Sequence, residues 1–341
     1  MYKNLLKKIG GMLVSSFLVV MLLSGFAAAQ KEDVSLLITT ATTGGTYYPV
    51  GVGMATLWTT KLKDQGIRVA AQSSAGSAEN IEMLRGKEVD LAILQGLFGK
   101  MVWRGTGVYK GRACKTVRSI TMLWPNTEHF VLIKSKAKTG NVMDMKGTRF
   151  SIGRAGSGTE RSTLTIMKGL GMSRESVKGE YLGYFESATA IKDRRIEGAS
   201  LVAGPPVAAV TDLFATPGVD VVILEFTDKQ LEAINEKTAY PGFRYLIPAD
   251  TYPGQTESVN SIAQPNYLGV REGADEDIVY LLTKTIFENL DYLHGVHKAT
   301  EYIKLKDALS GLPVPLHPGA MRYYKEMGLK IPESLIPPEA K

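Results

Sequence analysis

The sequence predicts an α/β fold built as two lobes with a ligand cleft between them. Two stretches of the chain alternate apolar β-branched runs with amphipathic runs, which is typical of strands and helices in turn. Two long apolar segments separate these stretches, and small polar turns follow several of the expected strands. Because strands that alternate with helices form parallel sheets, the turns after the strands share one sheet edge, where open α/β sheets bind ligands.

The first alternating stretch predicts a βαβαβ unit. We expect strands at residues 36–39, 67–71 and 89–94, and helices at residues 48–63 and 77–85. This order favours a parallel sheet with right-handed crossovers.

A second stretch repeats the pattern further along the chain. We expect strands at residues 149–153 and 199–202, helices at residues 159–170 and 188–196, and a further helix opened by Pro205 and Pro206. The segment LRGKEVDLAIL at residues 84–94 resembles RRIEGASLVAG at residues 194–204. Each of these two segments reads as a helix end, a tight connection and a buried strand, so the chain builds two similar lobes.

Two apolar segments, residues 120–133 and 259–270, are predicted to cross between the lobes as extended chain. Lobe 1 would then be discontinuous, comprising residues 30–125 plus 266–341, and lobe 2 would comprise residues 126–265 with a hinge segment at each end. The C-terminal helices, from residue 275 onward, would pack back on lobe 1. The alternative is two consecutive domains joined by one linker, but no stretch rich in Ser, Gly and Pro stands out as that linker.

The N-terminal 29 residues are predicted to be a signal peptide. Lys3, Lys7 and Lys8 precede an uncharged run at residues 9–26, and three alanines then offer a cleavage site after Ala29. The alternative is an anchor that is kept, because the uncharged run is just long enough to span a bilayer. We therefore expect the mature chain in the periplasm.

The amino-acid composition and net charge exclude some classes of function. Hydrophobic residues make up 44% and charged residues 22% of the chain, as in globular proteins. The formal net charge is +6, which falls to about +3 without the signal segment, so nucleic acid is not an expected partner. Cys114 is the single cysteine, so no intrachain disulfide can form, and its thiol is expected to be inert.

Catalytic and metal-binding signatures are missing from the sequence. There is no HExxH, GxxxxGK[ST] or GxSxG motif. His294 and His297 have helical i,i+3 spacing, but no carboxylate or cysteine pattern completes a metal site, so a surface helix is the better interpretation. The protein is expected not to be an enzyme and to need no cofactor or metal.

Three turns of small residues are predicted to form the ligand site. They lie at residues 43–49, 73–77 and 153–160, and each follows a strand and opens a helix. The first N–H groups of a helix are unpaired and the helix dipole is positive there, so such turns favour an anion. In the third turn, Ser157 and Glu160 also fit a capping box. Arg154 could pair with a carboxylate, and Gln95 offers both a donor and an acceptor.

Some aromatic residues near these turns are expected to flank the ligand, and others are expected to pack in the hydrophobic core. Tyr47 and Tyr48 are expected to flank the ligand, with core packing the alternative for at least one of them. Trp103 and Trp124 are expected to be packing residues outside the site.

Five segments together resemble the TAXI family, the TRAP-associated extracytoplasmic immunogenic solute receptors of tripartite ATP-independent periplasmic transporters. The segments are TTGGTYYPVG at residues 42–51, SSAGSAENIEML at residues 73–84, GKEVDLAILQ at residues 86–95, GSGTE at residues 156–160 and PLHPGAMRYYKEMG at residues 315–328. The resemblance implies a periplasmic-binding-protein-like fold that closes on a small organic anion, such as a glutamate-like amino acid or a dicarboxylate. It also implies delivery of that anion to a TRAP membrane permease.

The resemblance also implies which residues contact the ligand. The roles carry over to Thr43, Gly45, Thr46, Tyr47, Ser74, Gly76, Ser77, Gln95, Ser157, Gly158 and Thr159. The sequence departs from the family pattern at Gly96 and Leu97, where a polar residue is common, and at Arg154, where a small residue is commoner. Both departures leave the identity of the ligand open.

We therefore expect a monomeric, non-enzymatic receptor for a small organic anion. One alternative is an enzyme of related two-lobed architecture that acts on a small carboxylate, because a fold alone does not fix function. Another alternative is a ligand-sensing protein that uses the same cleft without transport.

Overall fold

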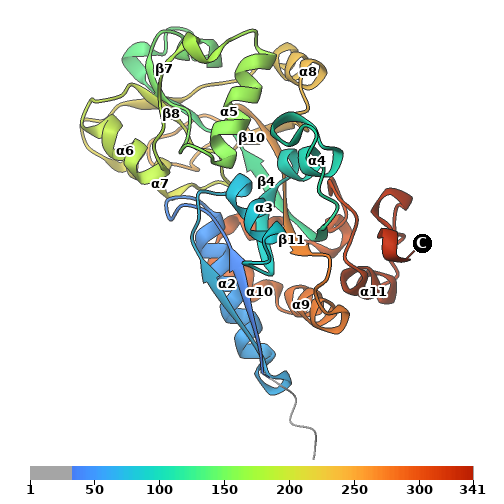
Figure 1. Cartoon of the computed structure of the whole chain (residues 1–341). Coiled ribbons are helices and arrows are strands. Elements are labelled where there is room, and N and C mark those ends of the chain that lie inside the picture. The colour runs from blue at the N-terminus through green and yellow to red at the C-terminus, as the bar shows by residue number, and fades with distance from the viewer. Residues whose placement is uncertain (1–32, 341) are drawn as a thin grey trace, which may run out of the picture. The chain divides into compact units, whose positions relative to one another are not determined.

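The computed structural model describes residues 33–340, so the predicted signal peptide and its cleavage after Ala29 lie outside the described residues. Two β-sheets and the helices around them make up the described chain (Figure 1). Among residues 33–340, no helix has the length and apolar content needed to cross a bilayer.

The first sheet contains the predicted βαβαβ unit. Its strand order is β10-β11-β3-β1-β2, with β4 also paired to β11. The strands are β1 (Val34–Thr39), β2 (Ile67–Gln72), β3 (Leu91–Gln95), β4 (Val117–Thr127), β10 (Phe243–Ile247) and β11 (Val259–Arg271). The connecting helices are α2 (Tyr47–Lys61) and α3 (Ser77–Arg85). Strands β1 and β3 are parallel, whereas β11 is antiparallel to β3, β4 and β10.

The second sheet has the order β7-β6-β8-β5-β9. Its strands are β5 (Phe130–Ile133), β6 (Arg149–Ser151), β7 (Lys178–Glu180), β8 (Gly198–Ser200) and β9 (Val221–Ile223). Its helices are α5 (Gly158–Gly169), α6 (Tyr184–Lys192), α7 (Ala208–Ala215) and α8 (Asp228–Lys237). Strand β6 is parallel to β8, as the repeated pattern predicts, and also to β7, a strand that the sequence analysis did not expect.

Two helix starts in the second lobe differ from the prediction. Helix α6 begins at Tyr184 rather than at residue 188, because the apolar periodicity used for the prediction missed its first turn. Helix α7 begins after the two prolines rather than with them. The carbonyl of Val207 is the first to accept helical hydrogen bonds, from the N–H groups of Val210 and Thr211, so the prolines precede the helix.

The two predicted crossing segments are strands that pair with each other. Strand β4 leads into β5 of the second sheet, and the chain returns through β11 (Figure 1). In the antiparallel β4–β11 pair, Thr127 lies opposite Ala263 and Asn126 lies opposite Gln264. The connection between the lobes is therefore a hydrogen-bonded ribbon, which restrains the lobes more than two separate loops would.

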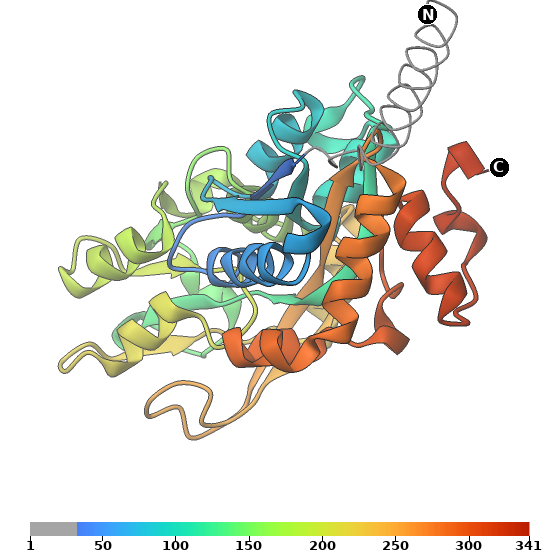
Figure 2. The same cartoon turned by 90° about the horizontal axis from the view of Figure 1, so that it is seen from below.

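The remaining helices complete the first lobe and its boundary with the second. They are α4 (Gly96–Arg104), α9 (Glu276–Glu288), α10 (Leu290–Val296) and α11 (Pro318–Glu326). One apolar cluster joins α9, α10 and α11 to α2, and the indole N–H of Trp58 donates to the carbonyl of Leu282 at 3.0 Å. Figure 2 shows α9 and α10, in orange, beside α2 in blue, and α11, in red, packed against α9.

A second apolar cluster runs across the boundary between the lobes. It includes Leu84 of α3 and Phe98 of α4 as well as Phe130 of β5, Ile166 of α5 and Ile234 of α8. A third cluster lies around α6 and α7 in the second lobe. The lobes thus share a continuous core on the α4 side of the molecule.

Candidate functional site

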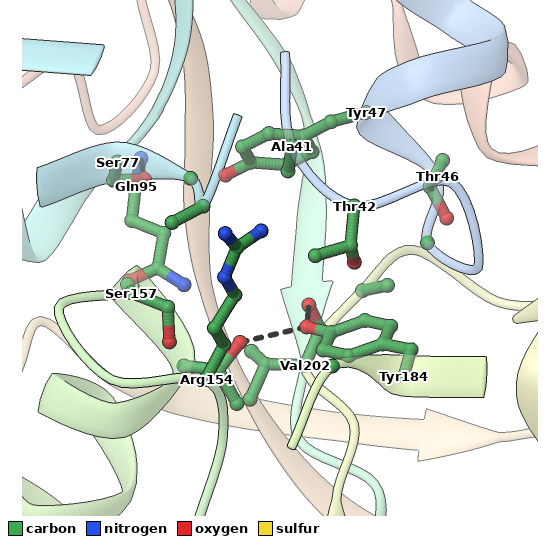
Figure 3. A pocket seen from close by; sticks show the side chains of 17 residues that line it. Ala41, Thr42, Thr46, Tyr47, Ser77, Gln95, Arg154, Ser157, Tyr184 and Val202 are labelled. Atoms are coloured by element: carbon green, nitrogen blue, oxygen red, sulfur yellow. Dashed lines mark hydrogen bonds between the residues drawn. The ribbon is translucent and has the colours of Figure 1, made fainter. Parts of the chain in front are cut away.

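The three predicted turns meet at one cavity between the lobes (Figure 3). Ten of the twelve predicted ligand-binding residues line it. They are Gly45, Thr46, Tyr47, Gly76, Ser77, Gln95, Arg154, Ser157, Gly158 and Thr159. Seven further residues line it that the sequence did not indicate. They are Ala41, Thr42, Ala75, Gly183, Tyr184, Val202 and Ala203.

The remaining two predicted residues, Thr43 and Ser74, lie outside the cavity. Thr43 is exposed on the turn, and its neighbour Thr42 faces the cavity instead. Ser74 is buried, with its hydroxyl 2.6 Å from the Asn80 Oδ1 atom and 2.9 Å from the Gly76 N–H that donates to it. Ser74 therefore holds the shape of the second turn, whereas Gly76 and Ser77 line the cavity.

Five helices begin at the cavity. Helices α2, α3 and α4 come from the first lobe and α5 and α6 from the second, and each has a residue of its N-terminal turn or cap in the cavity wall. The first N–H groups of a helix have no partner within the helix, and its dipole is positive there. The cavity therefore faces the positive ends of helices from both lobes.

The acidic residues in the first turns of two of these helices are used by the protein itself. Glu79 accepts a hydrogen bond from the Ala75 N–H, and Glu160 accepts one from the Gly156 N–H, both at 2.6 Å. Neither lines the cavity, and no Asp or Glu is among its lining residues. The exposed carboxylate of Glu186, in the first turn of α6, lies beside Gly183 of the cavity wall.

The first-lobe turn is fastened to the second lobe by its backbone and one hydroxyl. The Thr46 hydroxyl donates to the carbonyl of Gly204 at 2.6 Å, and the Ala209 N–H donates to the carbonyl of Gly44 at 3.3 Å. A Cβ atom at Gly45 would come within 3.1 Å of the Tyr184 ring. Glycine is needed here for close approach between the lobes.

Tyr47 and Tyr184 are matching residues in the two lobes. Each is the first residue of a helix that follows a glycine or threonine cap, and each is buried at the cavity. The Tyr47 hydroxyl donates to the Asn266 Oδ1 atom. The Tyr184 hydroxyl donates to the carbonyl of Val202 at 2.6 Å and lies 2.8 Å from the Thr159 hydroxyl. Burial raises the pKa of both phenols, so both stay neutral.

The second-lobe turn is capped differently from the prediction. The Ser157 hydroxyl caps α5 by accepting from the Glu160 N–H at 3.0 Å, as expected. The reciprocal bond of a capping box is absent, because the Ser157 N–H donates to the carbonyl of Arg154 at 3.0 Å. The Glu160 carboxylate bonds to the Gly156 N–H instead, which fixes the loop around Arg154.

Arg154 is the only ionised side chain among the lining residues. Its side chain extends from the second-lobe turn into the cavity, toward Tyr47 and Gln95 of the first lobe (Figure 3). Residues 154–156 are exposed, unlike the helix start that follows them. The space left free is about 30 Å³, roughly enough for one or two water molecules. A larger ligand therefore requires Arg154 to move or the lobes to separate.

Gln95 ends a row of polar residues that continues from the cavity into the hinge. Gln95 is opposite Asn266 on β11, and Gln264 is opposite Asn126 on β4. Since side chains two apart on a strand point to the same face, these four residues and Glu128 share one face. Each is buried and has at least one side-chain atom without a hydrogen-bond partner among the described residues.

The carboxyl group of Glu128 is buried at the inner end of this row. It accepts a hydrogen bond from the Tyr240 hydroxyl at 2.8 Å. Burial raises its pKa to about 8, because the interior disfavours the charged form. The sequence analysis did not single out Glu128; the available signal was a charged residue inside an otherwise apolar crossing segment.

The residues that the sequence set aside lie outside the cavity. Cys114 is buried beside the Thr116 hydroxyl, and Trp124 is buried in the first core cluster. Among the described residues, no group of His, Cys, Asp and Glu suits a metal ion. His297 is not a plain surface residue, because its Nε2 atom lies 3.1 Å from the carbonyl of Pro206 in the other lobe.

Several solved structures are similar to this chain at low sequence identity. A protein from Bordetella bronchiseptica RB50 is 15% identical, with a TM-score of 0.50, and the match covers 88% of this chain and 90% of that one. The periplasmic aliphatic sulphonate binding protein SsuA from Escherichia coli is 12% identical, with a TM-score of 0.43 and coverage of 86% and 82%. An ancestral arginine-binding protein bound to arginine is 14% identical, with a TM-score of 0.48 and coverage of 78% and 97%.

The similarity to the Bordetella bronchiseptica protein concerns the fold alone, which is a mixed α/β, two-lobed architecture with one sheet in each lobe. A family model matches most of the chain, from residue 38 to residue 328. The chain belongs to the NMT1-like family.

Proposed function

We propose that this protein is an extracytoplasmic receptor that binds a small organic anion between its lobes and delivers it to a membrane transporter. The observation that carries the proposal is the set of five helix N-termini, from both lobes, around a cavity whose one ionised side chain is Arg154. A helix N-terminus stabilises an anion by about 0.3–1 kcal/mol, and a hydrogen bond to a charged group by about 1.5–3 kcal/mol. Several together approach the roughly 8 kcal/mol of micromolar binding.

Lobe closure around the ligand is part of this proposal. The ligand first contacts the three helix starts of lobe 1, and the turn with Arg154 then completes the site from lobe 2. Opening would pivot on the shared apolar core near α4 and on the β4–β11 ribbon, because both join the lobes. Ligand binding favours the closed state, which is the form that docks on the transporter.

The transporter is of the TRAP type in this proposal, and the receptor is a TAXI-like, periplasmic monomer. Support comes from the five sequence segments that resemble TAXI receptors, four of which supply cavity residues. The lobe boundaries proposed from the sequence, residues 30–125 plus 266–341 and residues 126–265, fall on the two crossing strands.

The test is ligand binding by purified residues 30–341. Thermal unfolding is measured against amino acids, monocarboxylates and dicarboxylates, and hits are confirmed by calorimetry. A ligand at a hundred times its dissociation constant stabilises the protein by about 2.7 kcal/mol. Binding of one acid that is recovered unchanged supports a receptor. Chemical conversion of the bound acid would instead indicate an enzyme, and the absence of any binding anion would contradict the proposal.

A further inference from the structure

We infer, building on the proposed receptor function, that the cargo is a carboxylic acid without a protonated amino group. The charge and the free polar atoms around the cavity suit a hydroxy acid, an oxo acid or an unsubstituted dicarboxylate. They do not suit the ammonium group of an α-amino acid. The inference narrows the two ligand classes that the sequence left open to one.

The first argument is the charge around the cavity. An α-amino acid brings an ammonium group, and a buried ammonium needs a carboxylate or several free acceptors nearby. No Asp or Glu lines the cavity: Glu79 and Glu160 bond to the backbone of their own turns, and the carboxylate of Glu186, beside Gly183, is exposed to solvent. Five helix starts and the guanidinium of Arg154 would all repel the ammonium.

The carboxyl group of Glu128 does not supply the negative charge that a ligand ammonium group needs. Glu128 is buried in the hinge and does not line the cavity. Because burial raises its pKa to about 8, it is largely protonated at neutral pH. A neutral carboxyl at that position offers no ion pair to a ligand.

The second argument is which polar atoms remain free. The hydroxyls of Thr46, Tyr47 and Tyr184 already donate to oxygen atoms of the protein. Gln95 is 3% exposed, its side chain faces the cavity, and its Oε1 atom has no hydrogen-bond partner (Figure 3). The amide oxygen of Gln95 can accept a hydrogen bond from a ligand hydroxyl, and the amide N–H groups can donate to an oxo group. The same oxygen can accept only one of the three hydrogen bonds that an ammonium group donates.

The test compares ligands that differ only at this group. Dissociation constants are measured by calorimetry at pH 7.5 for three pairs: 2-hydroxyglutarate and glutamate, malate and aspartate, and lactate and alanine. We expect the hydroxy acid of the pair that fits the cavity to bind at least 100-fold more tightly than the amino acid. Equal or tighter binding of the amino acid would overturn the inference and leave the receptor function standing. Failure of every acid in the wider panel to bind would overturn both.

A charge reversal tests the physical cause. Arg154→Glu places a carboxylate where the cavity has a cation, and Arg154 is exposed, so the substitution should not disturb folding. We expect the ratio of hydroxy acid to amino acid affinity to fall at least tenfold. Lys178→Glu on strand β7 makes the same change at an exposed site outside the cavity, and should leave the ratio unchanged. A ratio that is equal in the two variants would contradict the role of cavity charge.

Discussion

The first-lobe turn at residues 41–47 and the second-lobe turn at residues 153–159 both lead into a helix at the cavity, but they are held in different ways. The first carries no charge and is tied across the cleft through Thr46 and Gly44. The second is held within its own lobe, by the Ser157 cap and by the Glu160 carboxylate, and exposes Arg154. The first turn therefore joins the lobes, whereas the second presents a charge. Four substitutions probe this difference.

Gly153→Ala should have the largest effect, because it alters the backbone of the second turn. Gly153 has a φ of 102°, and an added Cβ would come within 2.7 Å of Thr159. Left-handed backbone costs about 1–2 kcal/mol for other residues, and overpacking adds about 1–3 kcal/mol. We expect the free energy of unfolding, measured in denaturant, to fall by roughly 2–4 kcal/mol.

Gly156→Ala is the matched control for that change. Gly156 also has a positive φ, of 73°, but its Cβ would meet nothing within 4 Å. It should lose only about 1 kcal/mol. Equal losses in the two variants would mean that close packing against α5 does not hold the second turn.

Thr46→Val tests the tie made by the first turn. The substitution keeps the shape of the side chain and leaves the buried Gly204 carbonyl without its donor, which costs about 1–3 kcal/mol. Since this bond joins the lobes, the loss should fall on the closed form and weaken ligand binding by roughly 5- to 100-fold. Thr46→Ser retains the hydroxyl and should bind nearly as the wild type does. If calorimetry shows that Thr46→Val binds the ligand with wild-type affinity, the first turn does not contribute to closure of the lobes.

Glu128→Gln tests whether the hinge beneath both turns limits stability at alkaline pH. The pKa of Glu128 is raised from 4.5 to about 8, so its stabilising effect is complete below pH 4.5 and is lost as the pH rises toward 8. His129 acts oppositely and at lower pH, because burial lowers its pKa from 6.5 to about 4. Between pH 6.5 and 8 the wild type should therefore lose about 2 kcal/mol that the variant does not lose.

Denaturant titrations at several pH values check the Glu128 prediction. The quantity compared is the slope of the unfolding free energy against pH for the two proteins. Parallel slopes would show that Glu128 titrates in the folded protein as it does in the unfolded chain.

Ser157→Ala should have the smallest effect. The hydroxyl caps α5 within the second lobe only, and loss of such a cap costs about 1 kcal/mol. Ser157→Asp restores a capping acceptor but places a negative charge in the cavity wall, so it should recover stability and weaken anion binding. Thermal unfolding and calorimetry separate the two effects, and undiminished anion binding by Ser157→Asp would place the anion away from this turn.

The sequence predicted the βαβαβ unit, the two crossing strands and the meeting of the three turns, because each depends on local periodicity or on the edge of a parallel sheet. It placed Thr43 rather than Thr42 at the cavity, since the direction of a side chain in an irregular turn does not follow from spacing. Tyr184 and Val202 were missed because they reach the cavity only through the packing of the second lobe on the first. Glu128 had only one local signal, its charge inside an apolar crossing segment, because its environment is made by Tyr240 and Gln264, which are far away in the sequence.

The apolar cluster that joins α3 and α4 to β5, α5 and α8 has a consequence for folding. Each lobe leaves part of its interior to be covered by the other, so neither has a complete core of its own. Cooperative unfolding should therefore involve the whole described chain in one transition, despite its two sheets. Exchange of one lobe between homologous proteins would succeed only when the residues of this common core are exchanged with it.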